Sequence, residues 1–137
     1  MLAFRNGRVL TGSGFETGAT VLVENGRIAA ILQGDAPVDA EVVDLYGGLL
    51  VPGFIDLQVN GGGGVLFNND TSIDAIACIG RAHRRFGTTG FLPTLISDDA
   101  AVMARAIAAV RAAIAQHVPG VLGIHLEGPY LAHARKG

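Results

Sequence analysis

The residues best suited to chemistry lie in the segment His125-Leu126-Glu127-Gly128-Pro129-Tyr130-Leu131. Its carboxylate, Glu127, follows a short apolar run and precedes a Gly-Pro turn, which predicts that it lies at the C-terminal tip of a strand. Open α/β sheets and α/β barrels build their sites at that end. A carboxylate there is a hard oxygen ligand for a divalent metal ion. The spacing alone favours the alternative, a carboxylate that only caps a local turn.

Two earlier strands are also expected to end in polar side chains. Gln58 and Asn60 close the first of them, and Thr94 lies near the end of the second. Because side chains two apart on a strand share a face, Gln58 lies with Asn60, and His125 with Glu127. Amides, a hydroxyl, an imidazole and a carboxylate at one sheet edge can form a polar site. Ordinary strand-end polarity is the alternative, and we expect His125 to support the site or pack in the core.

To position these side chains, the chain after Pro52 is predicted to alternate strands and helices. The expected elements are a strand at 54–60, a helix at 73–86, a strand at 91–95, a second helix ending before 119–120, and a strand at 121–126. Such alternation implies right-handed crossovers and a parallel sheet. Pro93 weakens the middle strand. The glycine run 61–64 lacks a following Lys-Ser/Thr, so we expect a tight backbone passage rather than a phosphate loop.

The helix boundaries carry their own signals. Ser72 is the expected N-cap of the first helix. The run Ser97-Asp98-Asp99 is expected to supply the cap and the N-terminal negative charge of the second. The apolar stripe of the second helix is expected to comprise Met103, Ile107, Val110 and Ile114.

The first fifty residues are predicted to form small antiparallel strands. Apolar runs at 21–24 and 27–31 flank Asn25-Gly26, a pair typical of a two-residue type I′ hairpin loop. Further strands are expected at 3–10, 42–45 and 49–51. Pro52-Gly53 then marks a boundary, which gives expected domains of residues 1–52 and 53–137.

Composition excludes several classes of protein. The chain is 50% hydrophobic and 16% charged, which favours strands buried on both faces. A net charge of -2 gives no reason to expect nucleic acid or an acidic membrane as partner. The lone cysteine, Cys78, excludes an internal disulfide framework and fits a reducing compartment. Arg5 and Arg8 interrupt any N-terminal signal sequence, and we expect a cytoplasmic protein.

Several segments together resemble a known family. Residues 52–61 are similar to the first-strand signature of the amidohydrolase superfamily, in which most members place His-x-His where this chain has Gln58-Val59-Asn60. That substitution, followed by the glycine run and Val65-Leu66-Phe67-Asn68, resembles the N-acetylglucosamine-6-phosphate deacetylase family. The segments 88–95 and 125–131, with Arg135-Lys136-Gly137 behind the latter, resemble the same family. The resemblance implies a metal-dependent-hydrolase (β/α)8 TIM barrel, of which residues 53–137 would be the first three β/α units. Residues 1–52 would be the N-terminal part of a small β-sandwich.

The resemblance also implies a chemistry. Family members hydrolyse N-acetyl-D-glucosamine 6-phosphate to D-glucosamine 6-phosphate and acetate with a metal-activated water. Glu127 corresponds to the carboxylate ligand of a single divalent ion, with zinc expected and iron, cobalt or manganese as alternatives. Gln58 corresponds to a residue that approaches the ion, often through water, and Asn60 and His125 are candidates to support it. Amides in place of imidazoles weaken any second metal position. The family's catalytic aspartate matches no position in this chain.

Two other interpretations stay open from the sequence. One is the N-acetylgalactosamine-6-phosphate counterpart of this enzyme. The other is a catalytically inactive fragment that needs a missing C-terminal segment, because three β/α units cannot close an eight-stranded barrel. Family resemblance implies a homodimer or homotetramer acting on a small amino-sugar phosphate.

Overall fold

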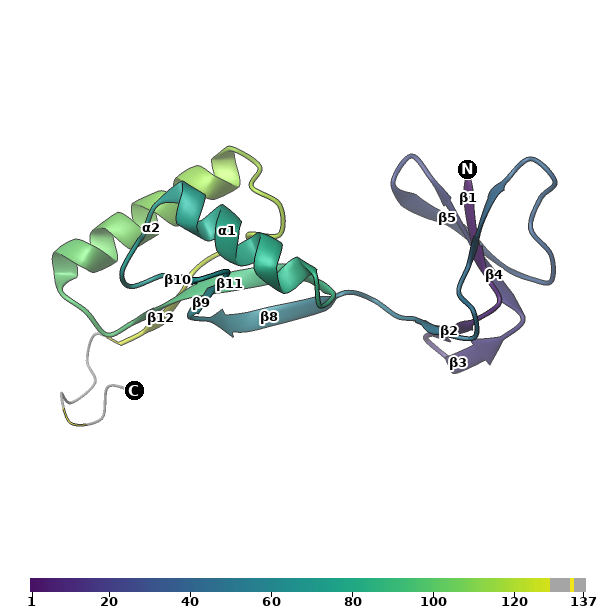
Figure 1. The fold of residues 1–137 in the computed structure, drawn as a ribbon, viewed down its shortest axis with the longest axis horizontal. Coiled ribbons are helices and arrows are strands. Elements are labelled where there is room, and N and C mark those ends of the chain that lie inside the picture. The colour runs from purple at the N-terminus through teal and green to yellow at the C-terminus, as the bar shows by residue number, and fades with distance from the viewer. Residues whose placement is uncertain (129–133, 135–137) are drawn as a thin grey trace. The chain divides into compact units, whose positions relative to one another are not determined.

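The computed structural model describes residues 1–128 and 134 and shows a mixed α/β fold (Figure 1). The chain divides into two compact units, Met1–Pro52 and Gly53–Gly137. Each unit has its own cluster of buried apolar side chains. Of the segment 125–131, residues 129–131 lie outside the described residues, as do 135–137.

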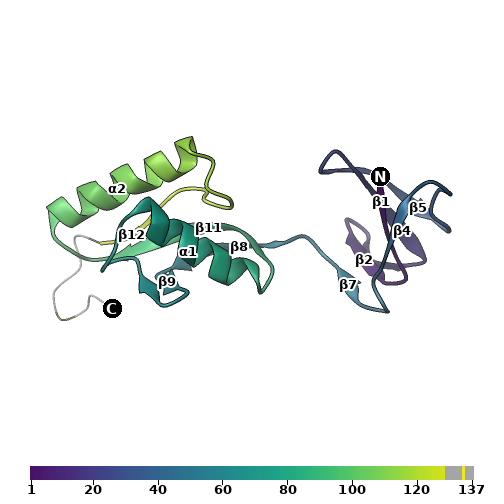
Figure 2. The same cartoon turned by 45° about the horizontal axis from the view of Figure 1, so that its top comes forward.

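A parallel sheet carries the second unit. Its order in the described residues is β12-β11-β8, formed by β8 (Phe54–Val59), β11 (Thr88–Ile96) and β12 (His125–Glu127). Both neighbouring pairs are parallel, as predicted. Helices α1 (Ile73–Arg84) and α2 (Ala100–Ala115) lie on the same face of this sheet in both views (Figures 1 and 2).

The core of this unit fills the space between the sheet and the two helices. Its buried members are Val59, Phe67, Ile76, Ile79, Phe91, Leu95, Ala106, Val110, Ala113 and Val121. The predicted stripe of α2 is therefore wrong in part, because Ala106, Val110 and Ala113 face the core while Ile114 is 43% exposed. The small alanine side chains let α2 lie close to the sheet. The prediction selected only the large apolar side chains and therefore missed the alanines that face the core.

Helix α1 begins as predicted. Ser72 Oγ accepts a hydrogen bond from Ala75 N at 3.1 Å, which satisfies one of the free amides at the helix start. The helix ends at Arg84, two residues before the expected end. Gly87, with φ +94°, turns the chain into β11.

All three strands of this sheet differ in their bounds from the prediction, and β8 ends at Val59, one residue before the expected end. β11 is longer than expected and contains Pro93, at a point where its register with β8 shifts. Because proline donates no backbone hydrogen bond, a sheet tolerates it at a register shift, where the regular pairing is interrupted. β12 is shorter than expected, and before it Val121 makes only an isolated bridge to Phe91. Glu127 is consequently the last residue of a strand rather than the residue after one.

The glycine run forms a tight hairpin. β9 (Gly61–Gly62) and β10 (Val65–Leu66) pair antiparallel across Gly63-Gly64, which have φ of +63° and +85°. A Cβ on Gly61 would lie 2.3 Å from the Val65 carbonyl oxygen. The run is thus a close backbone passage, as expected.

The first unit consists of two small sheets, of order β5-β4-β1-β6 and β3-β2-β7. The strands are β1 (Leu2–Arg5), β2 (Arg8–Thr11), β3 (Gly14–Thr17), β4 (Ala19–Glu24), β5 (Arg27–Gln33), β6 (Glu41–Asp44) and β7 (Leu49–Leu50). The β4–β5 hairpin confirms the type I′ prediction, because Asn25 and Gly26 have φ of +51° and +74°.

Three expectations for this unit are wrong. Residues 3–10 are two strands in different sheets, separated at Asn6, whose φ of +59° breaks the extended run. Not all pairs are antiparallel, since β6 runs parallel to β1 and β7 parallel to β2. Strand β3 was not expected. A Cβ on Gly7 would meet the Gly48 carbonyl oxygen at 2.7 Å, so the two turns touch and bring β6 and β7 alongside.

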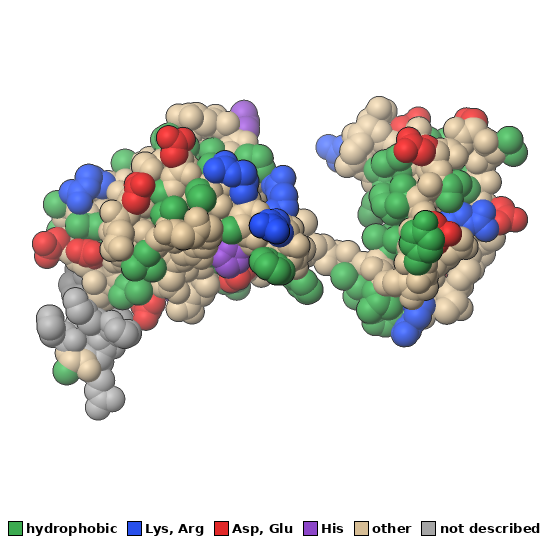
Figure 3. Space-filling model, viewed as in Figure 1, with side chains coloured by type: hydrophobic (Ala, Val, Ile, Leu, Met, Phe, Trp, Pro, Cys, Tyr) green, Lys and Arg blue, Asp and Glu red, His purple; other side chains and the backbone are tan. Residues whose placement is uncertain are grey.

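Hydrophobic side chains remain on the surface of both units (Figure 3). On β8, Phe54, Ile55 and Leu57 are 61%, 62% and 64% exposed, and on β5 Ile28 is 68% exposed. Neither α1 nor α2, within the described part of the chain, has the length and apolar character to cross a membrane.

Candidate functional site

Gln58 and Glu127, separated by 69 positions in the sequence, meet at the carboxyl end of the parallel sheet. Gln58 Nε2 donates a hydrogen bond to Glu127 Oε2 at 3.5 Å. Gln58 is exposed on β8 and Glu127 is half-buried at the end of β12. The separation is at the long limit for a hydrogen bond, so the two side chains are neighbours rather than a tightly locked pair. Solvent can reach the space beside them.

His125 lies two residues before Glu127 and pairs with the middle strand. Its Nδ1 is 3.3 Å from Thr94 Oγ1, and the same hydroxyl donates to the Leu92 carbonyl oxygen at 3.3 Å. Thr94 is fully buried. Which of the two groups donates across this contact depends on the tautomer of His125. His125 is thus held within the sheet.

Asn60 does not lie on β8, although the strand was expected to reach it. It follows the strand, is half-buried, and its carbonyl oxygen accepts from Phe67 N at 2.8 Å. This bond ties the end of β8 to the residue after the glycine hairpin. A role for the Asn60 side chain in the site stays a prediction.

Ser97 contacts the candidate ligand directly, a contact that sequence reasoning missed. It was expected to help cap α2, but the N-cap of that helix is Asp99. Ser97 Oγ instead donates to the Glu127 carbonyl oxygen at 2.6 Å. Gly128 follows with φ +117°, and a Cβ there would lie 2.0 Å from Ser97 Oγ. No local pattern distinguishes a serine that caps a helix from one that bonds to a strand 30 residues later.

Asn68 was likewise missed. Its Oδ1 accepts from Ile96 N at 2.9 Å, and its Nδ2 donates to Ile96 O at 2.9 Å and to Asp98 Oδ2 at 3.0 Å. One carboxamide therefore pairs with both backbone groups of the last residue of β11. In the sequence Asn68 ends one of the segments that resemble the family, but no local pattern predicts its pairing with Ile96.

The donor chemistry fits part of a divalent metal site. Glu127 offers a charged hard oxygen and Gln58 a neutral amide oxygen, both suited to a divalent cation. The described residues contain no group of three His, Cys, Asp or Glu side chains that could hold an ion. Catalytic zinc usually has three protein ligands, so Glu127 and Gln58 account for only a part of the set.

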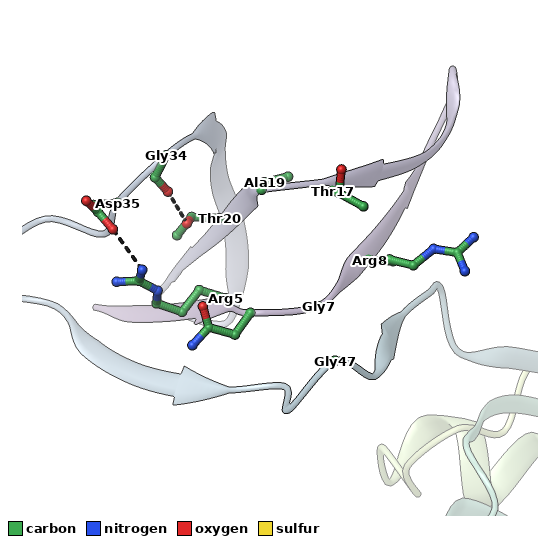
Figure 4. A pocket seen from close by; sticks show the side chains of 11 residues that line it. Arg5, Gly7, Arg8, Thr17, Ala19, Thr20, Gly34, Asp35 and Gly47 are labelled. Carbon is green, nitrogen blue, oxygen red and sulfur yellow. Dashed lines mark hydrogen bonds and ion pairs between the residues drawn. The ribbon is translucent and has the colours of Figure 1, made fainter.

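A separate cavity of about 530 Å³ lies within the first unit (Figure 4). The guanidinium of Arg5 on its wall is bonded to Asp35 at 2.7 Å, and Thr20 Oγ1 donates to Gly34 O at 2.6 Å. The Arg8 guanidinium stacks over Phe15 at 4.8 Å from the ring centre. Both arginine side chains that line this cavity are thus engaged with neighbouring side chains, and we assign no chemistry to the cavity.

Two carboxylates outside the candidate site have lowered pKa values. The backbone N–H of Ser72 donates to Asp70 Oδ1 at 2.9 Å and lowers the pKa of Asp70 at the start of α1. The backbone N–H of Tyr46, and then the Asn6 amide, lower the pKa of Asp44. Both shifts come from hydrogen bonds to the charged form and mark turns rather than chemistry.

Comparison with known proteins connects this geometry to a family. No family model matches the sequence. The N-acetylgalactosamine-6-phosphate deacetylase of Shewanella sp. (strain ANA-3) is 41% identical over 140 residues, which cover 100% of this chain and 36% of that protein. The N-acetylglucosamine-6-phosphate deacetylase of Haemophilus influenzae is 38% identical over 118 residues, 85% of this chain and 31% of that protein.

The crystal structure of N-acetylglucosamine-6-phosphate deacetylase from Pasteurella multocida superimposes with a TM-score of 0.91 at 37% identity. The alignment covers 97% of this chain and 35% of that one. The chain belongs to the N-acetylglucosamine-6-phosphate deacetylase family. This confirms the resemblance read from the sequence. The chain spans about a third of the length of the deacetylases it matches, and the match lies in their N-terminal part.

Proposed function

We propose that the whole protein to which these residues belong hydrolyses N-acetyl-D-glucosamine 6-phosphate to D-glucosamine 6-phosphate and acetate. The observation that carries this proposal is the agreement with the Pasteurella multocida deacetylase over 97% of the chain at a TM-score of 0.91. The pair of Gln58 and Glu127 at the sheet edge supports it, because it supplies oxygen ligands where α/β sheets build their sites.

In this proposal Glu127 binds a single divalent ion and Gln58 approaches it, directly or through a water. Zinc is the expected ion, with iron, cobalt or manganese as alternatives. When bound, such an ion lowers the pKa of a coordinated water toward about 7 and polarises the acetamide carbonyl. Asn60 and His125 support the two strand ends. We assign no general acid or base to the described residues.

We further propose that the second unit is the start of a (β/α)8 barrel and the first unit part of a β-sandwich. Parallel strands with both helices on one face, and polar residues at their carboxyl ends, support the barrel. Three strands leave such a barrel open, so we expect the 137-residue chain alone to be inactive. A cytoplasmic location and a homodimer or homotetramer remain predictions for the whole protein.

The galactosamine 6-phosphate epimer is a second candidate substrate, because the relative at 41% identity carries that name. Acetate release from each epimer, measured with the whole protein and with the 137-residue chain, separates the possibilities. Release from neither substrate by the whole protein would refute the deacetylase proposal.

The ligand assignment has its own test. We expect Glu127→Ala to remove both the bound metal, measured by elemental analysis, and the release of acetate. Glu24→Ala, an exposed carboxylate at the end of β4, is the matched control and should change neither. Metal content and rate that are unchanged in Glu127→Ala would remove Glu127 from the site.

A further inference from the structure

We propose that Asn68 and Ser97 are positioning residues that fix Glu127 for metal binding. The inference rests on the metal site proposed above and extends it to two side chains that reach Glu127 only through backbone contacts.

Ser97 holds the main chain of Glu127. Its hydroxyl donates to the Glu127 carbonyl oxygen at 2.6 Å, a short separation even for an O–H···O bond. Both residues are half-buried, so water competes less for this bond than it does at the surface. On the other side Gly128 has φ +117° and would place any Cβ 2.0 Å from the same hydroxyl. The backbone at Gly128, directly after Glu127, therefore packs closely against the Ser97 side chain.

Asn68 holds Ser97 in turn. Its carboxamide pairs with N–H and C=O of Ile96, both at 2.9 Å, in the manner of a neighbouring strand. Ile96 is the last residue of β11, is in register with Glu127 on β12, and is followed directly by Ser97. Hydrogen bonds thus connect Asn68, in the loop after β10, to Ile96 at the end of β11, and the next residue, Ser97, to Glu127.

A structural role and a positioning role give different results. If Asn68 and Ser97 only stabilise the fold, their removal lowers stability and leaves the metal site of the folded protein as it was. If they position Glu127, the folded variants bind metal more weakly and with an altered ligand geometry. Residues that orient a metal ligand typically change affinity by about 10- to 100-fold.

The test uses Co²⁺ as the probe, added to the metal-free whole protein, with its visible absorption as the readout. We expect Asn68→Ala and Ser97→Ala to bind Co²⁺ about 10- to 100-fold more weakly and to change the shape of the absorption bands. Ser97→Thr keeps the hydroxyl and should restore binding. Asn69→Ala replaces the exposed neighbouring residue, and this control variant should bind Co²⁺ as the wild-type protein does.

Circular dichroism first establishes which variants are folded. A folded Asn68→Ala or Ser97→Ala protein that binds Co²⁺ within twofold of the unchanged protein, with the same spectrum, overturns the inference for that residue. Should Asn68→Ala fail to fold, Asn68→Asp takes its place, since it keeps the acceptor for Ile96 N and loses the donors. An unchanged protein that binds no divalent ion refutes the proposed function itself, a result distinct from the other two.

Discussion

Replacing Gln58 by glutamate tests whether this side chain and Glu127 share one site. The Gln58 amide nitrogen is 3.5 Å from a Glu127 oxygen, so Gln58→Glu places two carboxylates at about that separation. Their repulsion is about 5 kcal/mol at an effective dielectric constant of about 20 and about 1 kcal/mol at about 80. Because Gln58 is exposed, the value near water applies. We expect a loss of about 1–2 kcal/mol in the free energy of unfolding at pH 7.

Urea unfolding in the presence of a chelator measures that loss. It should shrink in high salt, which screens exposed charges. Gln58→Met, similar in size and uncharged, is the control and should show no salt dependence. Addition of a divalent ion should turn this loss in the free energy of unfolding of Gln58→Glu into a gain, since two carboxylates bind a cation better than one. Two results together would show that the two side chains do not share a site. In chelator, Gln58→Glu would have the same free energy of unfolding as Gln58→Met, and added metal would stabilise it no more than it stabilises that control.

Three further results are expected. Ile79→Ala should lower the free energy of unfolding in urea by about 2–5 kcal/mol, because Ile79 is fully buried, whereas Ile55→Ala at an exposed position should cost less than about 1 kcal/mol. Ser72→Ala should cost about 1 kcal/mol in the same assay by removing the cap of α1, and no loss would contradict the capping bond. Because the pKa of Asp70 is lowered by folding, its contribution is present above the unfolded pKa of about 4 and lost as pH falls through the folded pKa. Urea midpoints from pH 7 to 2.5 should therefore fall less steeply in Asp70→Asn, and parallel curves would refute this.

Local signals predicted the elements that local interactions determine. Asn25-Gly26 identified a hairpin because its conformation requires both residues at positive φ. Ser72 identified a helix start because its hydroxyl bonds three residues away. The proximity of Gln58 and Glu127 followed from the parallel order of the strands, which the alternation of strands and helices predicts.

Features that depend on distant partners could not be read this way. The break at Asn6 is an exception, because Asn6-Gly7 is the same kind of turn signal as Asn25-Gly26, and the prediction of one strand over residues 3–10 overlooked it. Pro93 argues against a central strand unless a register shift is known to lie there. The roles of Asn68 and Ser97 depend on bonds across 28 and 30 positions, which periodicity and capping rules do not address.

The exposed apolar side chains of β8 have a consequence for how this chain behaves in concentrated solution. β8 is at the edge of the described sheet, and an apolar edge strand is a template for pairing with another copy. Asp56 interrupts the run between Ile55 and Leu57 with a charge, as gatekeeper residues do in aggregation-prone segments. Asp56→Val would leave Phe54 to Leu57 as an uninterrupted hydrophobic stretch. We therefore expect Asp56→Val to increase self-association of the 137-residue chain, which light scattering would measure.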